Sequence, residues 1–313
     1  RLYGVNLMEK RVPVWHPDVR YFELEKGGSI IGGVYLDLYA REGKRGGAWM
    51  NDYRGRRRFT TGDKIGQMQT PVAYLVCNFT PPVGGKEARL SHDEIITLFH
   101  ETGHGLHHLL TQVDELGVSG INGVEWDAVE LPSQFMENFV WEYDVLAEMS
   151  AHEENGAPLP RVLFDKMVAA KNFQRGMFMV RQMEFALFDM QIYSQSEQSR
   201  LNEWPQVLEA VRREVSVVQP PAYNRFALSF GHIFAGGYSA GYYSYSWAEV
   251  LSADAYAAFE ESDDVKATGK RFWQEVLAVG GSRSAMESFK AFRGREPKID
   301  ALLRHSGFDA DAA

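Results

Sequence analysis

The stretch "TLFHETGHGLHHLL", residues 97–110, places four of the chain's nine histidines within nine positions. His100 and His104 are four residues apart, so on a helix both imidazoles lie on one face and can reach the same metal ion. Glu101 completes the pattern HExxH, in which the carboxylate acts as general base on a metal-bound water. Zinc suits this pattern, because two imidazoles and one carboxylate leave a fourth position for water. The stretch therefore predicts a catalytic zinc site on a helix.

The same helix marks the change from strand patterns to helix patterns along the chain. Ser91 and Glu94 form the Ser-x-x-Glu pattern of a capping box, which predicts that the helix begins there. Residues at helical spacing then predict a stripe that faces the core: Ile95, Leu98, Thr102, Leu106 and Leu109. Before this helix, 29–40 and 70–79 are β-branched and aromatic runs typical of strands, so we expect a small sheet near the N-terminus.

The chain after this helix is expected to be mostly helical. Continuous helices are predicted over four stretches: 131–149, 159–194, 222–230 and 240–259. Methionines and phenylalanines from Met177 to Met190 are interpreted as core packing rather than a cofactor site. No change of composition divides the chain. We therefore predict a mainly α fold that forms one domain over 1–313, with strands in 1–90 and helices in 91–313.

A third metal ligand has to come from outside the HExxH helix. The segment "GVEWDAVELPSQFMEN", 123–138, offers four acids: Glu125, Asp127, Glu130 and Glu137. Spacing alone does not choose among them. We favour Glu130, because it precedes the predicted start of the next helix, where a side chain projects from a fixed point. The alternative is an acidic cluster that is merely favoured by the dipole of that helix.

His107 and His108 are further candidates on the same helix. His108 would lie about 12 Å along the helix axis from His100, at about 1.5 Å per residue, so one ion cannot bind all four histidines. The longer motif HExxHxxGxxH also fails, because His107 occupies its glycine position and Leu110 its last histidine. We therefore expect His107 and His108 on the helix surface or in support of the ligands.

Composition limits the classes of binding partner and the cellular compartments that we expect for this chain. The net charge of −9 argues against binding to nucleic acid, and the one basic cluster, "RGRRRF" at 54–59, is interpreted as a solvated loop. Cys77 is the single cysteine, which excludes an intrachain disulfide and favours a reducing compartment. No apolar run is long enough to span a membrane. We expect a cytoplasmic protein, and the start at Arg1 instead of methionine suggests a piece of something longer.

A second segment with functional character is "GHIFAGGYSAGYYSY", 231–245. Taken alone, it is an aromatic helix whose tyrosines could serve only for packing. Its glycines at Gly236, Gly237 and Gly241 allow backbone conformations that other residues resist. Such freedom favours a loop that closes over a bound peptide.

These segments together resemble the M3 family of zinc oligopeptidases, and within it the bacterial oligopeptidase A branch. Further matching stretches are "YLDLYAREGKRGGAWMND", 35–52, and "GGSRSAMESFKAFRGREPKIDALLRHSGF", 280–308, so the resemblance covers almost the whole chain. It implies a zincin-like catalytic domain of the neurolysin and thimet oligopeptidase type. It also implies that His100, His104 and Glu130 bind one Zn²⁺ per chain and that Glu101 polarises the attacking water.

The resemblance carries further roles onto this chain. Asp127 would orient a ligand histidine by accepting its second N–H. His232 and Tyr245 would stabilise the oxyanion that forms on the peptide carbonyl, and Tyr238 and Tyr242 would grip the substrate. The implied activity is hydrolysis of internal bonds in short peptides. The alternatives are a dipeptidyl carboxypeptidase of the same family and a truncated module that binds zinc and peptides without turnover.

Two features depart from the family pattern. Thr102 stands where the family commonly has phenylalanine, which predicts slightly poorer packing and no loss of chemistry. Family members are also considerably longer, with an N-terminal helical region that forms the opposite wall of a channel. The chain resembles their C-terminal catalytic half. We expect apolar surface that the N-terminal region normally covers to be exposed, which favours self-association.

Overall fold

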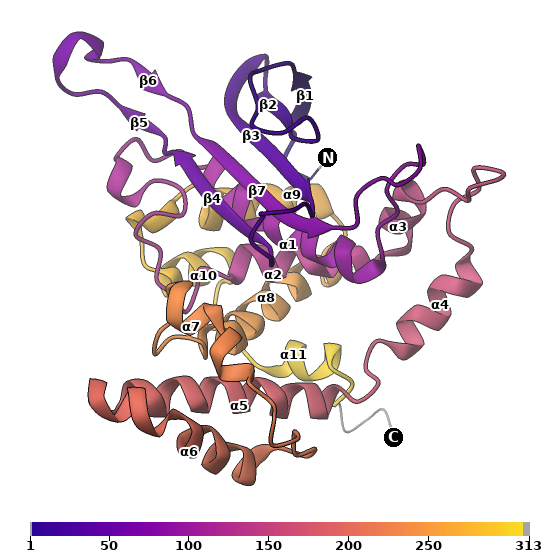
Figure 1. Cartoon of the computed structure of the whole chain (residues 1–313). Coiled ribbons are helices and arrows are strands. Elements are labelled where there is room, and N and C mark those ends of the chain that lie inside the picture. Colours follow the sequence, from indigo (N-terminus) through magenta and orange to yellow (C-terminus); the bar gives the residue numbers. More distant parts are fainter. Residues whose placement is uncertain (1, 309–313) are drawn as a thin grey trace.

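The computed structural model describes residues 2–308, apart from the side chains of 199–201. The N-terminal part forms a five-stranded sheet in the order β1-β2-β3-β7-β4 (Figure 1). Its strands are β1 (Asn6–Lys10), β2 (Arg20–Lys26), β3 (Ser29–Tyr39), β4 (Trp49–Arg54) and β7 (Val72–Phe79). β3 and β7 pair in parallel, and the other neighbours pair antiparallel. The two strands predicted from the sequence are β3 and β7, and both predictions are confirmed.

The basic cluster at 54–59 is not the solvated loop that we predicted, because part of it lies in strands. It runs from the end of β4 into β5 (Arg57–Arg58), which pairs with β6 (Met68–Gln69) in a small two-stranded ribbon. Arg56 and Arg58 form salt bridges with Asp114 at 2.9 and 3.0 Å. Two positive charges of the cluster are therefore paired within the protein.

Helix α1 (His92–Leu109) carries the histidine-rich stretch and begins where the sequence predicted. The Ser91 hydroxyl accepts from the Glu94 amide, and the Glu94 carboxylate accepts from the Ser91 amide, so the capping box is confirmed. The first half of α1 is half-buried, whereas most residues from Glu101 onward are buried. The second half of the helix is thus enclosed by other elements.

Two glycines allow this enclosure, because they face different neighbours of α1. A Cβ on Gly103 would lie 2.3 Å from the carbonyl oxygen of Pro132, at the start of α2 (Leu131–Glu137). A Cβ on Gly105 would lie 3.1 Å from the Leu75 side chain in β7. The backbone of α1 therefore packs closely between α2 and the sheet, and this packing sets the positions of the residues around Gly103.

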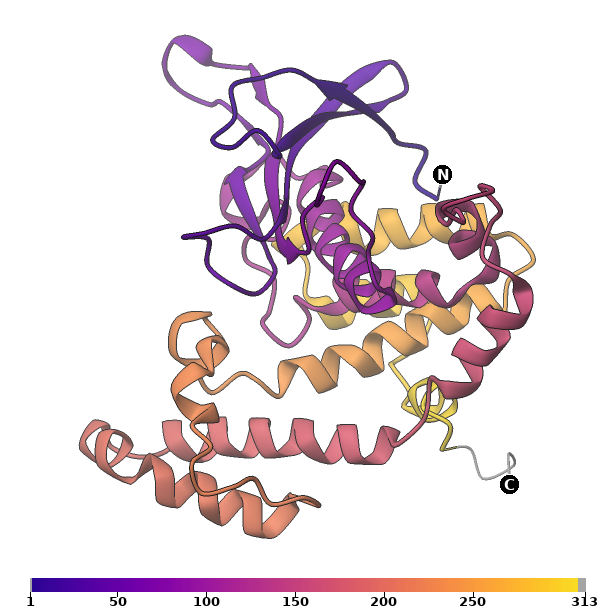
Figure 2. The same ribbon diagram turned by 45° about the vertical axis from the view of Figure 1, so that its right-hand side comes forward.

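The remaining chain is mostly helical, as predicted. The other helices are α3 (Tyr143–Met149), α4 (Arg161–Ala170), α5 (Arg175–Tyr193), α6 (Glu197–Val215), α7 (Gly231–Ala235), α8 (Ser244–Glu260), α9 (Val265–Phe272), α10 (Ala285–Arg293) and α11 (Asp300–His305). The sheet lies on one side of the molecule and the α5–α6 pair on the other, with α8 between them (Figure 2). A cluster of buried aromatic residues from α2, α8, α9 and α10 forms the largest core, in which Phe135 and Phe272 stack at 4.1 Å.

Three of the predicted helices differ from the structure. The stretch 131–149 is α2, a short 3₁₀ turn and α3. The stretch 159–194 breaks between α4 and α5, where Gln174 has a left-handed backbone with φ of 55°. The stretch 222–230 contains only a 3₁₀ turn, Phe226–Ser229. The first two of these breaks lie beside one cavity, which is described below.

The interpretation of Met177–Met190 as core is wrong for most of the methionines. Phe188 is fully buried, but Met177, Met183 and Met190 are 39%, 38% and 47% exposed. α5 packs mainly on α6, so its opposite face carries apolar side chains at the surface. No helix in the described residues has the length and apolar character needed to cross a bilayer.

Candidate metal centre

Three potential ligands converge where α1 meets α2. His100 and His104 lie one turn apart on α1, with ring centroids separated by 5.0 Å. Glu130 is the N-cap residue of α2, and its Oε2 lies 3.2 Å from His100 Nε2 and 3.1 Å from His104 Nε2. One ligand atom from each residue lies within 4.8 Å of the others. The sequence-based choice of these three residues thus corresponds to one cluster in space.

The cluster fits a metal ion in both spacing and chemistry. Ligand atoms bound at about 2.0–2.1 Å to a tetrahedral zinc lie about 3.4 Å apart, close to the two separations from Glu130. Glu130 is 1% exposed, and although burial raises its pKa, the two histidines hold that pKa well below its usual range. A buried carboxylate in its charged form, next to two imidazoles, is the donor set of a catalytic zinc site.

Hydrogen bonds fix the Glu130 carboxylate from two further directions. The Ser133 hydroxyl donates to Glu130 Oε2 at 2.7 Å. The Tyr238 hydroxyl donates to Glu130 Oε1. Ser133 lies on the first turn of α2, and Tyr238 comes from the distant aromatic segment. Residues of α2 and of the aromatic segment 231–245 therefore both hold this carboxylate.

The ring nitrogen of His100 that does not face Glu130, Nδ1, contacts Glu137 and not Asp127. Glu137 lies at the end of α2, and its Oε1 lies 2.6 Å from His100 Nδ1. Within the described residues, His104 Nδ1 is buried without a hydrogen-bond partner. Asp127 thus accepts from neither ring, because it lies in the turn before α2 and not on the helix face that packs on α1. The expectation for Asp127 is corrected in favour of Glu137.

Glu101 is buried beside the cluster and is free of strong partners. It is 4% exposed, and its Oε2 has no hydrogen-bond partner among the described residues. Burial raises the pKa of Glu101, against the opposing effect of His100 and His104. A carboxylate with a raised pKa and an unused oxygen can take a proton from a neighbouring group, as a general base must.

His107 and His108 do not lie on the helix surface. They are 3% and 0% exposed, because the sheet covers that side of α1. His108 Nε2 lies 3.0 Å from the Arg54 carbonyl oxygen, to which it donates. Burial lowers the pKa of His107 to about 3, so this ring is neutral. Both histidines are therefore buried, and His108 contacts the end of β4, which corrects the expectation that they lie on the helix surface.

The aromatic segment 231–245 lies next to the Glu130 carboxylate. The Tyr238 and Tyr245 rings stack at 4.9 Å, and the His232 ring lies 5.9 Å from Tyr245. Tyr242 is 9% exposed, packs on Phe230 and hydrogen-bonds Gln182 through its hydroxyl. The four residues predicted from this segment therefore form one aromatic group, in which Tyr242 packs on Phe230 and Tyr238 contacts a candidate ligand.

Sequence analysis missed the residues that hold this segment in place. Asp189 on α5 is fully buried and accepts from the backbone amides of Ala240 and Tyr242, each at 2.9 Å. Trp126 packs edge-on against Tyr238 at 4.8 Å. A Cβ on Gly237, whose φ is +87°, would lie 2.8 Å from the Trp126 ring. Only the glycine gave a signal in the sequence, since a buried aspartate within a helix has no distinguishing pattern.

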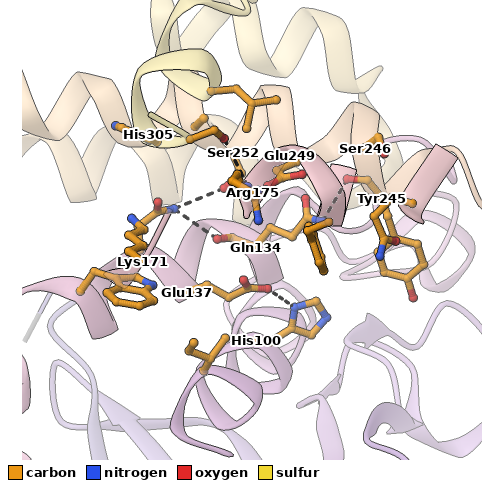
Figure 3. Close-up of a pocket in the computed structure, with 18 of the residues that line it drawn as sticks. His100, Gln134, Glu137, Lys171, Arg175, Tyr245, Ser246, Glu249, Ser252 and His305 are labelled. Carbon is orange, nitrogen blue, oxygen red and sulfur yellow. Dashed lines mark hydrogen bonds and ion pairs between the residues drawn. The ribbon is translucent and has the colours of Figure 1, made fainter. Parts of the chain in front are cut away.

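A cavity of about 350 Å³ opens next to His100. Figure 3 shows it bounded by α1, α2, the junction of α4 and α5, and α8, with Tyr245 at one end and Lys171 at the other. Glu137 and Tyr242 also line it. The candidate metal centre and the aromatic group thus share an opening that is large enough for part of a peptide.

Comparisons with known proteins agree with this geometry. The sequence profile described as peptidase family M3 matches residues 1–308. Oligopeptidase A of Escherichia coli is 54% identical over 98% of this chain and 45% of its own length. Dipeptidyl carboxypeptidase of Salmonella typhimurium is 37% identical over 99% of this chain and 45% of its own length. The chain therefore spans about 45% of the length of these curated relatives.

A solved structure shares the fold. The structure titled "PZ peptidase A with inhibitor 2" superposes with a TM-score of 0.57 over 87% of this chain and 42% of that chain, at 17% sequence identity. At this identity the likeness concerns the fold alone. It agrees with the zincin-like, mostly helical architecture expected from the sequence.

Proposed function

Because the chain belongs to peptidase family M3, we propose that it carries a zinc-dependent centre that hydrolyses internal bonds of short peptides. One observation carries the proposal: three ligand atoms, from His100, His104 and Glu130, lie within 4.8 Å of one another beside the buried Glu101. We take 1–313 as a single catalytic domain. When bound, zinc would supply Lewis acidity that polarises a peptide carbonyl and activates a water.

The chain's own residues divide the remaining work. Glu101 takes the proton of the attacking water and later passes it to the leaving amine, for which its raised pKa is suited. Glu137 holds the His100 ring in one orientation through the 2.6 Å contact. These contacts fix the direction in which each group meets the substrate.

The aromatic group acts on the carbonyl oxygen of the substrate. Tyr245 donates a hydrogen bond as negative charge grows on that oxygen. His232, whose ring centre lies 5.9 Å from that of Tyr245, helps to stabilise the same charge. Tyr238 exchanges its hydrogen bond to Glu130 for one to the substrate. The stacking of Tyr238 on Tyr245 supports this assignment, because the Tyr238 hydroxyl contacts Glu130 and the Tyr245 ring lies directly beside it.

A second candidate function is release of C-terminal dipeptides. The 37% identity to a dipeptidyl carboxypeptidase over almost the whole chain favours it. Both functions use the same centre and differ only in where the peptide is held. Mapping the products of one peptide by mass spectrometry separates internal cuts from dipeptide release.

The experiment that tests the proposal is hydrolysis of an internally quenched peptide by this chain. We expect turnover that is abolished by a chelator and restored by zinc, and a Glu101→Gln variant that still binds zinc but is at least about 1,000-fold slower. Equal rates for wild type and Glu101→Gln, with one zinc per chain in both, would refute the catalytic assignment.

A further inference from the structure

The cavity beside the candidate metal centre contains charged groups that are nearly all paired. The Glu137 carboxylate contacts His100, and the Glu249 carboxylate accepts from Arg175 (Figure 3). His305 pairs with Glu260 at 2.9 Å. These contacts neutralise the charged side chains along most of the cavity wall.

Lys171 is the exception. It caps the C-terminal end of α4, is half-buried and lines the cavity, yet its side chain forms no salt bridge or hydrogen bond with the described residues. Its ammonium lies 4.9 Å from the centre of the Trp141 ring. The break at Gln174 separates α4 from α5 and keeps this lysine at the cavity end opposite Tyr245.

The acids nearest to Lys171 are already engaged. Glu142 accepts from the Tyr256 hydroxyl, and Glu260 forms salt bridges with Arg304 and His305. Burial, with Arg175 nearby, lowers the pKa of Lys171. A partly desolvated ammonium without a counter-ion is unfavourable, and an incoming anion offsets that cost.

We propose that Lys171 binds a carboxylate of the peptide substrate in this cavity. The inference rests on the proposed function, because the cavity opens at His100 and a peptide is the ligand expected there. Every unblocked peptide has a C-terminal carboxylate, and some have aspartate or glutamate side chains, so the same ammonium can recognise either source. Polar side chains around it, among them Gln134 and Ser252, complete a lining suited to an ionic group.

The test measures peptide binding to zinc-loaded Glu101→Gln protein, so that the probe is not consumed. Three fluorescein-labelled heptapeptides share one uncharged sequence and end in a carboxylate, in an amide, or in a glutamate with an amidated terminus. We expect the carboxylate peptide to bind about tenfold more tightly than the amide. Lys171→Met should reduce this ratio to about one, and Lys171→Arg should keep it.

Lys166→Met is the matched control, because Lys166 lies on the exposed side of α4 and outside the cavity. It should leave the tenfold ratio unchanged. Tight binding of the glutamate peptide would show that a side-chain carboxylate can also occupy the site, and its absence would show that the site requires the C-terminal carboxylate. Equal dissociation constants for all three peptides, or a ratio that survives Lys171→Met, would overturn the proposal. Hydrolysis of the amide peptide by the wild-type chain would still support the proposed function in that case.

Discussion

The metal cluster and the aromatic segment face the same cavity but are held in different ways. Glu130 and His104 are 1% and 8% exposed, and α1 touches the α2 backbone at Gly103. In the aromatic segment, by contrast, His232 and residues 234–237 are exposed. Its backbone is held by side chains of other elements: Asp189 accepts from two of its amides, and Tyr193 and Gln134 donate to the Ile233 and Tyr245 carbonyl oxygens.

This difference reflects what is required of metal ligands and what is required of groups that act on a substrate. Metal ligands have to keep one geometry, so they are placed where core packing fixes them. Groups that act on a substrate have to admit it and close on it, so they are placed where few contacts have to break. Substitutions in the metal cluster should therefore change metal affinity as well as stability, whereas substitutions in the aromatic segment should leave metal affinity unchanged.

After Glu101→Gln, the largest effect is expected from Tyr245→Phe. Loss of an oxyanion donor should lower kcat by about 100- to 1,000-fold, with unchanged melting temperature and zinc content. Steady-state kinetics on the quenched peptide measures the effect. Tyr243→Phe is the control, because Tyr243 is 43% exposed and should retain full activity. A Tyr245→Phe protein that loses zinc would contradict the separation of the two regions.

Gly103→Ala, unlike Tyr245→Phe, should change both stability and zinc affinity. The added methyl would lie 2.3 Å from Pro132 O and 2.5 Å from Ser133 Cα, so α1 and α2 have to move apart. We expect a loss of about 3 kcal/mol in the free energy of unfolding, together with weaker zinc binding. Urea denaturation and zinc titration measure both. Gly117→Ala, where a Cβ meets nothing within 4 Å, should leave them unchanged, and an equally harmless Gly103→Ala would refute the packing argument.

Glu137→Gln and Asp127→Asn compare the two acids that were candidates to accept a hydrogen bond from a ligand histidine. We expect zinc affinity to fall by about 10- to 100-fold, because the His100 ring loses its charged partner. Competition with a chromophoric chelator gives the affinity. Asp127→Asn should have no effect, and a larger loss in Asp127→Asn than in Glu137→Gln would restore the original expectation.

The smallest effect is expected from Gly237→Ala. An alanine at φ of +87° is strained, and its methyl would push the Trp126 ring away from Tyr238. The expected loss is about 1 kcal/mol in the free energy of unfolding, with zinc affinity unchanged. Urea denaturation of this variant and of Gly46→Ala, a position with open space, measures the difference. Weakened zinc binding in Gly237→Ala would show that the two regions are more tightly coupled than we infer.

Local sequence patterns predicted the parts of the molecule that depend on neighbouring residues. The capping box at Ser91 and Glu94 is confirmed, and so are the strands at 29–39 and 72–79. The pair His100 and His104 needs only helical spacing to meet. Each of these features is determined within a few residues, so the pattern carries the information.

Features that depend on tertiary packing were predicted poorly. Strand β4 has four exposed residues and lacks an apolar pattern, since its pairing with β7 defines it. The left-handed backbone of Gln174 separates α4 from α5, and no local signal in the sequence marks it. The burial of His107 and His108 depends on the sheet that covers α1. Glu137 could be chosen over Asp127 only once the packing of α2 on α1 was known.

We infer that the packing of α1 on α2 presents one metal site. Anomalous diffraction at the zinc edge, from crystals grown with one equivalent of zinc, would locate the ion. We expect a single strong peak within about 2.0–2.2 Å of His100 Nε2, His104 Nε2 and a Glu130 oxygen. A peak elsewhere, or no ordered zinc between these three residues, would contradict it.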